Sequence, residues 1–252
     1  MNPLLEAHGL TKRIDGVLIV DEVDFVARAG QVTVIVGPNG AGKTTLFDCL
    51  SGVGTPDAGS VWHRGEDVTA LPSDALARRG LARTFQRSSV FPTMTVADNL
   101  MVAAESHRRR GLLRGVVGMP EPRRLRHGAA VREVLADLGL TPAAHVVAGE
   151  LSPGTLHLVE LGRALCTGPD TLLLDEPASG LDDTEAEHLH QLLHRLAARN
   201  LAVVMIEHDL RLVDETADVV YVMAAGRAVV SGSPKDVLRR ADVSSLLFGR
   251  PS

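Results

Sequence analysis

The chain has 252 residues, of which 45% are hydrophobic and 23% charged, a composition typical of one globular domain or of a domain with an insertion. Its net charge of −5 excludes a nucleic-acid binder that relies on overall positive charge. Two cysteines without metal-type spacing, no apolar run of membrane-spanning length and no signal-peptide pattern favour an intracellular protein.

In chain order, the hydrophobic pattern predicts alternating strands and helices. β-branched and apolar runs predict strands at 31–36, 61–63, near 68, 171–175, 202–207 and 219–223. Helices are expected from residue 42, at 73–80 and at 184–199. The last helix carries one apolar face, formed by Leu189, Leu192, Leu193 and Leu196. This alternation predicts an α/β fold with a mainly parallel sheet, interrupted over about 88–167 by a mostly helical insert.

The insert contains a basic segment. Residues 101–132 include eight arginines and two glutamates, which gives a local charge of +6 in a chain whose total is −5. Three explanations fit such a segment: a solvated loop, contact with anionic lipid headgroups, or contact with a protein partner.

A phosphate-binding pattern, G-x-x-x-x-G-K-[ST], lies between a predicted strand and a predicted helix. Its glycines let backbone N–H groups face phosphate oxygens, and a helix N-terminus favours anions. Lys43 would reach the β- and γ-phosphates with a compact charge, and Thr44 would ligate Mg²⁺. The predicted nucleotide-binding residues here are Gly37, Pro38, Asn39, Gly40, Ala41, Gly42, Lys43, Thr44 and Thr45.

Polar side chains follow the predicted strands further along the chain. Asp175 ends the strand at 171–175, where it would hold Mg²⁺, and Glu176 would polarise an attacking water. His208 follows the strand at 202–207 and could donate a hydrogen bond to the γ-phosphate. The amide of Gln86 could ligate Mg²⁺ or hold a water. Each of these patterns is weak alone, and together with the phosphate loop they predict a nucleotide hydrolase.

The order of these motifs resembles that of the ATP-binding subunits of ABC transporters, over nearly the whole chain. Three segments, 83–86, 91–100 and the basic insert, are more similar to the ATPases of branched-chain amino acid importers. The C-terminal segments 232–234 and 247–249 are similar too. Lipopolysaccharide-export ATPases share much of this pattern and remain an alternative.

The resemblance implies a P-loop NTPase fold: one ABC ATPase domain over 1–252, with a core at about 1–87 and 168–252, an antiparallel N-terminal β region, and a helical subdomain at about 88–167. It implies Mg²⁺-dependent ATP hydrolysis that drives the import of a branched-chain amino acid or a related small polar solute, at the cytoplasmic face of the plasma membrane. The implied partners are a second ATPase subunit, like or unlike this one, integral permease subunits and, indirectly, a solute-binding protein. No nucleic-acid partner is expected.

The resemblance also assigns roles to residues. Glu176, His208 and Gln86 would be catalytic, and two ATP molecules would be sandwiched between two ATPase subunits. Ser152 and Gly154 would contact the partner's nucleotide, and Asp182 would link the two sites.

The chain departs from the family pattern at two places. The signature usually reads LSGGQ. Here Ser152 and Gly154 match it, whereas Pro153 replaces its first glycine and Thr155 replaces its glutamine. If Ser152 caps a helix, Pro153 falls at the first helical position, where proline is favoured. Ile14 replaces the aromatic residue on which many members stack adenine, so π-stacking is lost. We therefore expect weaker ATP binding and slower turnover. An ATP-sensing module with little turnover remains an alternative function.

Two other classes fit less well. Soluble ABC ATPases of translation or DNA repair carry tandem nucleotide domains or a long coiled-coil insert, for which 252 residues are too few. A P-loop kinase is disfavoured because Asp175, Glu176 and His208 suit hydrolysis better than transfer to a bound acceptor.

Overall fold

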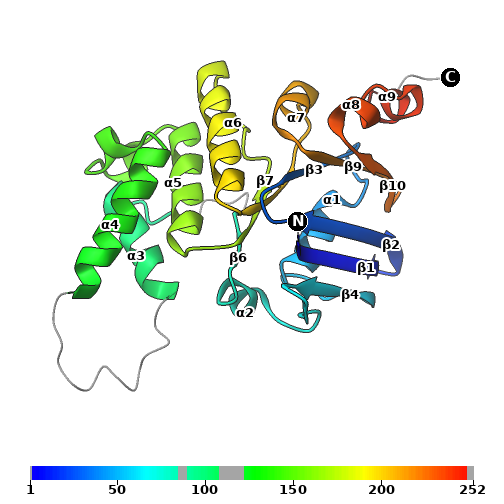
Figure 1. Cartoon of the computed structure of the whole chain (residues 1–252), viewed down its shortest axis with the longest axis horizontal. Coiled ribbons are helices and arrows are strands. Elements are labelled where there is room, and N and C mark those ends of the chain that lie inside the picture. Colours follow the sequence, from blue (N-terminus) through cyan, green and yellow to red (C-terminus); the bar gives the residue numbers. More distant parts are fainter. Residues whose placement is uncertain (1, 85–89, 108–121, 249–252) are drawn as a thin grey trace. The chain divides into compact units, whose positions relative to one another are not determined.

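The computed structural model describes residues 2–84, 90–107 and 122–248 (Figure 1). The chain divides into two compact units. The first consists of Met1–Arg83, Asp170–Ala178 and Asp182–Ser252, and the second of Thr84–Pro169 and Ser179–Leu181. In the described part of the chain, no helix is long and apolar enough to cross a bilayer. Gln86 and residues 108–121 of the basic segment lie outside the described residues.

A six-stranded sheet forms the centre of the first unit. Its strands, in spatial order, are β10 (Arg227–Gly232), β9 (Val219–Ala224), β3 (Val32–Val36), β8 (Ala202–Ile206), β7 (Thr171–Asp175) and β6 (Leu81–Arg83). All neighbouring strands are parallel except β10, which is antiparallel to β9. The predicted mainly parallel sheet is thus confirmed, and the predicted strands at 31–36, 171–175, 202–207 and 219–223 correspond to β3, β7, β8 and β9.

The central strands are mostly apolar because both faces of the sheet are covered. Every residue of β3, β7 and β8 is buried. Helix α1 (Lys43–Leu50) lies on one face of the sheet. Helix α6 (Asp183–Ala198) packs against β3 and β8. The leucines that predicted the apolar face of α6 are all buried there: Leu189, Leu192, Leu193 and Leu196.

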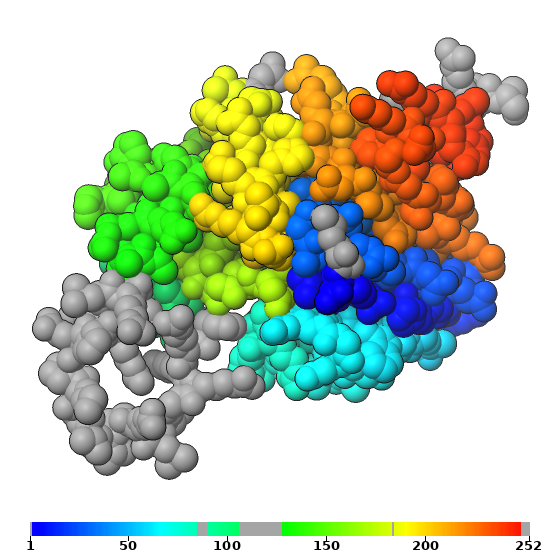
Figure 2. All heavy atoms as spheres, viewed as in Figure 1, coloured from blue at the N-terminus to red at the C-terminus, as the bar shows by residue number. Residues whose placement is uncertain are grey.

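A second, four-stranded antiparallel sheet completes the first unit. Its order is β2 (Val17–Arg28), β1 (Pro3–Ile14), β4 (Ala58–His63) and β5 (Glu66–Asp67), which confirms the expected antiparallel N-terminal region. In Figure 2 the atoms of the first two strands (blue) lie on the surface beside those of the segment that contains β4 (cyan).

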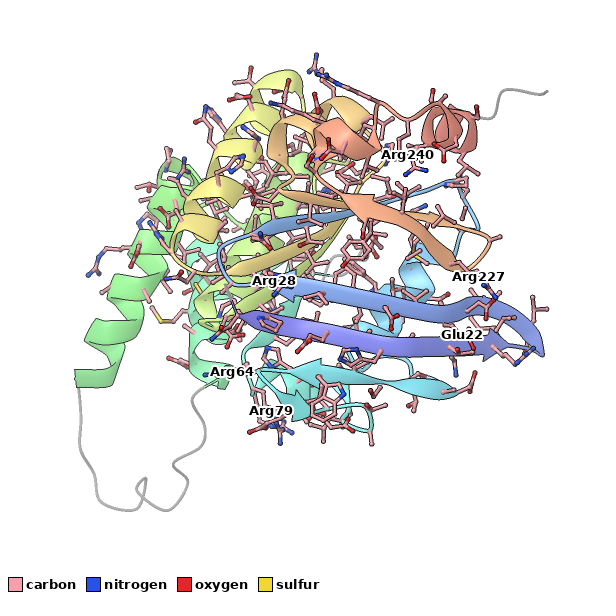
Figure 3. All side chains as sticks on the ribbon, turned by 45° about the vertical axis from the view of Figure 1, so that its right-hand side comes forward. Glu22, Arg28, Arg64, Arg79, Arg227 and Arg240 are labelled. Atoms are coloured by element: carbon pink, nitrogen blue, oxygen red, sulfur yellow. The ribbon has the colours of Figure 1, made fainter. Side chains whose placement is uncertain are left out.

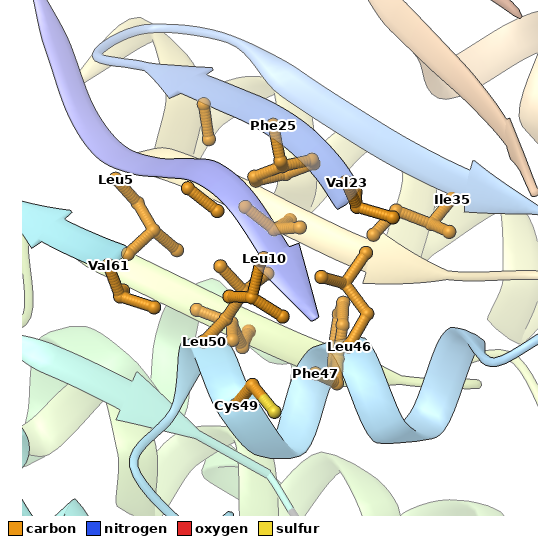
Figure 4. Packing of buried hydrophobic residues seen from close by; sticks show 14 of the residues in the cluster. Leu5, Leu10, Val23, Phe25, Ile35, Leu46, Phe47, Cys49, Leu50 and Val61 are labelled. Carbon is orange, nitrogen blue, oxygen red and sulfur yellow. The ribbon is translucent and has the colours of Figure 1, made fainter. Parts of the chain in front are cut away.

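The main hydrophobic core lies between this sheet and α1. Figure 4 shows Leu46, Phe47 and Leu50 of α1 directed toward residues of β1 and β2 such as Leu10 and Phe25. Each of these side chains is at most 1% exposed. Burial of one such side chain contributes about 1.5–3 kcal/mol, so the core anchors α1, and with it the phosphate loop that precedes α1.

Ion pairs also join the two sheets of the first unit. Arg227 at the start of β10, labelled in Figure 3, pairs with Asp21 of β2 at 2.6 Å. The buried His63 of β4 contacts Asp170, just before β7, with 3.0 Å between Nε2 and Oδ1. The nearby Arg64 contacts the other oxygen of Asp170 at 3.3 Å.

The remaining helices of the first unit are short: α2 (Ser73–Ala77), α7 (Leu210–Thr216), α8 (Pro234–Val237) and α9 (Ala241–Phe248). The second unit is helical in its described part, as predicted for the insert. It contains α3 (Val96–His107), α4 (Pro122–Asp137), α5 (Pro153–Cys166) and the 3₁₀ turns η1 (Thr141–Ala143) and η2 (Ala148–Glu150). Gly162 of α5 packs so closely against Leu100 and Leu138 that a Cβ atom would lie within 2.9–3.3 Å of them.

Candidate functional site

The predicted chemical groups gather at one edge of the six-stranded sheet. Because β3, β6, β7 and β8 are parallel, their carboxyl ends share that edge. In the register, Asp175 of β7 lies beside Ile206 of β8, and Ile206 beside Ile35 of β3. The residues that follow these strands, Gly37, Glu176 and His208, therefore lie close together, as sequence reasoning expected.

At Gly37 and Gly42, the loop between β3 and α1 lies too close to other backbone segments to accommodate a side chain. A Cβ atom at Gly37 would lie 2.3 Å from the carbonyl oxygen of Met223, and one at Gly42 would lie 2.5 Å from that of Ile19. Gly42 also has φ 95°, a left-handed conformation that glycine tolerates. No side chain caps the N-terminus of α1. The start of the helix is thus open to an anion.

Lys43, the first residue of α1, folds back over this loop. Its Nζ donates hydrogen bonds to the carbonyl oxygens of Gly37 at 2.7 Å and Pro38 at 3.0 Å. Burial lowers the pKa of Lys43, and the nearby charges of Glu176 and Asp175 oppose that shift. The two hydrogen bonds hold the ammonium group against the start of the loop.

Asp175 is buried, and its two oxygens differ in environment. Oδ2 accepts a hydrogen bond from Arg83 at 3.4 Å, whereas Oδ1 has no hydrogen-bond partner among the residues that the structure describes. Burial raises the pKa of Asp175, and Arg83 opposes that shift. A buried carboxylate oxygen without a partner is a suitable ligand for a hard cation, so the site fits Mg²⁺.

Glu176 and His208 flank the same edge. The backbone of Glu176 has φ 49°, a left-handed conformation that is uncommon for a residue with a side chain. Its N–H donates to the carbonyl oxygen of Ile206 at 3.1 Å, which fixes the start of the loop after β7. Nδ1 of His208 lies 3.9 Å from Oε1 of Glu176, too far for a hydrogen bond, and the His208 side chain is 68% exposed.

Glu207, to which sequence reasoning gave no role, connects the two loops. Its side chain is 1% exposed. Oε1 accepts the backbone N–H of Ala178 at 3.3 Å, and Oε2 accepts that of His208 at 2.9 Å. The carboxylate thereby joins the loop that carries Glu176 to the one that carries His208. An acid directly after an apolar strand and before the histidine was the available signal.

Ile14 ends β1 and is 47% exposed. It pairs across the β1–β2 turn with Val17, which is 60% exposed. Further along the same hairpin, Ile19 touches the phosphate loop at Gly42. The hairpin thus presents aliphatic side chains to solvent and reaches the loop.

The altered signature lies in the second unit and forms a regular helix start. Ser152 is the N-cap of α5, its Oγ accepts the N–H of Thr155 at 3.2 Å, and Pro153 occupies the first turn. Both sequence-based expectations for this helix start are confirmed, and Gly154 is buried directly after Pro153.

Asp182, in the first unit, caps α6. Its Oδ1 accepts the N–H groups of Thr184 and Glu185 at 2.9 and 2.8 Å, and the Glu185 side chain accepts the N–H of Asp182 in return. This capping box fixes the backbone conformation just before α6.

The chain is similar to known proteins over nearly its whole length. A family model described as ABC transporter matches residues 20–179. The branched-chain amino acid transport ATP-binding protein BraF of Pseudomonas aeruginosa is 37% identical over 98% of both chains, and LivG of Escherichia coli K12 is 36% identical over the same shares. The ADP conformation of MJ1267, an ATP-binding cassette of an ABC transporter, has a TM-score of 0.86 at 30% identity, covering 99% of this chain and 100% of that one. The chain belongs to the ABC transporter family, as an ATP-binding subunit and ATPase.

Proposed function

We propose that this chain is the ATP-hydrolysing subunit of an importer for branched-chain amino acids. The relatives named for that transport match nearly the full length of the chain. The observation that carries the proposal is the position of Asp175 and Glu176 at the sheet edge where the phosphate loop begins. Both a phosphate cradle and acidic groups for hydrolysis are thus available at one place.

In the proposed reaction, residues 37–45 bind the ATP phosphates, and Thr44, Asp175 and Gln86 hold Mg²⁺. The metal supplies positive charge that offsets the charge of the phosphates. Glu176 takes a proton from water as the water oxygen attacks the γ-phosphorus, and the bond from that phosphorus to the oxygen of ADP breaks. His208 orients the γ-phosphate and the water. The products are ADP and inorganic phosphate.

The proposed assembly contains two ATPase subunits that meet head to tail at the cytoplasmic face of the membrane. Ser152 and Gly154 of one subunit then complete the nucleotide site of the other, and Asp182 links the two sites. ATP closes the pair and hydrolysis opens it. Integral permease subunits transmit this motion, and a solute-binding protein delivers the amino acid to them. The exposed, aliphatic Ile14 contacts adenine without stacking.

Uptake by whole cells tests the proposal. In the source organism, deletion of the gene should reduce the initial uptake rate of radiolabelled leucine, and the intact gene should restore it. A gene carrying Glu176→Gln should be expressed but should not restore uptake. Unchanged leucine uptake in the deletion strain would contradict the proposed solute class, and loss of lipopolysaccharide transport instead would favour the export alternative.

A further inference from the structure

Arg83 has a position that the catalytic roles above do not explain. It is the last residue of β6, and its side chain is 6% exposed. Nη1 donates to Oδ1 of Asp48 at 2.7 Å and to Oγ of Ser51 at 2.8 Å, and Nη2 donates to Oδ2 of Asp175 at 3.4 Å. One guanidinium group therefore contacts both α1 and the end of β7.

The two contacted elements are those that carry the expected Mg²⁺ ligands. Asp48 lies one turn after Thr44 on α1, and residues four apart lie on the same face of a helix. Arg83 thus fixes the distance between the helix that presents Thr44 and the strand end that presents Asp175. Cζ of Arg83 also lies 5.6 Å from the centre of the Phe47 ring, so its side chain packs on α1 as well.

The contact with Asp175 also sets the direction of that carboxylate. Arg83 binds Oδ2, and Oδ1 is the buried oxygen without a hydrogen-bond partner in the described part of the chain. A carboxylate held by one oxygen has little freedom to rotate, so the other oxygen keeps a fixed direction. Groups that hold a metal ligand in this way commonly contribute 10–100-fold to metal affinity.

The geometry requires arginine. A guanidinium group has several N–H donors in a rigid fork, whereas lysine has one nitrogen on a flexible stem. Asp48 and Asp175 are bound by different nitrogens of Arg83. A lysine here would keep the positive charge but would not hold both carboxylates in the same geometry.

We propose that Arg83 is a positioning residue for the Mg²⁺ that accompanies ATP: it holds Asp175 and the helix of Thr44 in the arrangement that binds the metal. This inference rests on the proposed function. Arg83 touches neither nucleotide nor metal in this role, and it acts through its two carboxylate partners.

The test measures metal and nucleotide binding separately in the full-length protein. Arg83→Met removes the fork and retains an apolar stem over Phe47, and Arg83→Lys retains the charge alone. Arg79→Met is the matched control, because it removes the same charge from a partly exposed arginine whose ion pair with Glu66 is 3.8 Å long. Thermal melting establishes which variants are folded. A fluorescent ATP analogue is then titrated in EDTA and over a range of Mg²⁺ concentrations, and Mn²⁺ binding is followed by electron paramagnetic resonance.

We expect Arg83→Met to bind the analogue in EDTA as the wild type does, but to require about 10–100-fold more Mg²⁺ or Mn²⁺ for half-saturation. Arg83→Lys should be intermediate, and Arg79→Met should match the wild type. If Arg83→Met does not fold, Arg83→Lys and Asp48→Asn test the inference instead. Both variants should require more Mg²⁺ or Mn²⁺ for half-saturation than the wild type.

Unchanged metal dependence in the folded Arg83 variants, with normal binding by the wild type, would overturn this inference and leave the proposed function standing. A wild type that binds no nucleotide even with metal would overturn the proposed function and this inference with it.

Discussion

Lys43 donates a hydrogen bond from Nζ to the carbonyl oxygen of Gly37 at 2.7 Å, across the loop that joins β3 to α1. Its ammonium group also donates to the carbonyl oxygen of Pro38 at 3.0 Å. Phosphate oxygens would replace neutral carbonyl oxygens as its acceptors, and charge-assisted hydrogen bonds are stronger than neutral ones.

Replacement of Lys43 by arginine tests whether charge alone suffices. Lys43→Arg keeps the charge, but a planar guanidinium group is too large for a position that bonds to two carbonyl oxygens of the same loop. We expect Kd for ATP to rise by at least about tenfold, as a lost charge-assisted hydrogen bond implies. Isothermal titration calorimetry measures it, with Lys235→Arg on α8 as the control. Equal affinity of Lys43→Arg and wild type would contradict the assigned role.

His208 is expected to act in turnover more than in binding. Its ring is exposed and lies 3.9 Å from Glu176, so its removal leaves the phosphate loop intact. His208→Ala should lower the rate of phosphate release by about 100-fold, the lower range for such catalytic groups, with little change in Kd for ATP. His8→Ala provides a matched control, because His8 is 54% exposed and also lies 3.9 Å from a carboxylate, that of Glu6. Similar rates for both variants would argue against a catalytic role.

An aromatic residue at position 14 should strengthen nucleotide binding. Ile14 is 47% exposed on the hairpin that touches Gly42, and a tyrosine there could stack on adenine. Ile14→Tyr should gain about 1 kcal/mol, roughly a fivefold lower Kd for ATP. Val229→Tyr, at a similarly exposed aliphatic residue of β10, should leave Kd unchanged. No difference between the two variants would show that Ile14 does not contact the base.

The cap of α5 is expected to contribute to stability. Ser152 accepts the N–H of Thr155, and Ser152→Ala leaves that donor without its partner. The free energy of unfolding should fall by about 1 kcal/mol, whereas Ser152→Asp should retain most of it. Urea titration followed by circular dichroism measures both. An unchanged free energy of unfolding for Ser152→Ala would mean that solvent satisfies the helix end equally well.

Because the Cys49 thiol is buried, we expect the protein to lose stability at alkaline pH. Burial raises the pKa of its thiol from an ordinary value of 9.0 to about 11. The neutral thiol is therefore favoured in the folded state: its contribution is fully present below pH 9.0 and is lost as the pH rises through about 11. Cys49→Ala should show a smaller decline in unfolding free energy over that interval than the wild type. Parallel declines would contradict the assigned cause.

Three of the strands that the sequence predicted share one physical property. β3, β7 and β8 are buried on both faces, so their sequences are mostly apolar, with Thr33, Thr171 and Asp175 as their polar residues. β1 and β2 were not predicted from their pattern, because both are partly exposed and their pairing contains register shifts. β10 alternates exposed and half-buried positions and was missed for a similar reason.

The residues of the site also fall into those that the sequence predicted and those that it did not. The phosphate loop and the pair Asp175 and Glu176 are contiguous in sequence, so their motifs could be recognised directly. Arg83 depends on Asp48, 35 residues away, and on Asp175, 92 residues away. Glu207 depends on Ala178, 29 residues away. The partners of such side chains are set by tertiary contacts, which a local sequence pattern does not identify.

Release of inorganic phosphate from Mg²⁺–ATP by the purified chain tests the central claim most directly, with Glu176→Gln measured beside the wild type. The wild type should turn over, and Glu176→Gln should bind ATP equally well, release phosphate at least about 100-fold more slowly and form an ATP-dependent dimer in sedimentation. Equal rates of phosphate release by the two proteins, or no ATP-dependent dimer of Glu176→Gln, would contradict the account.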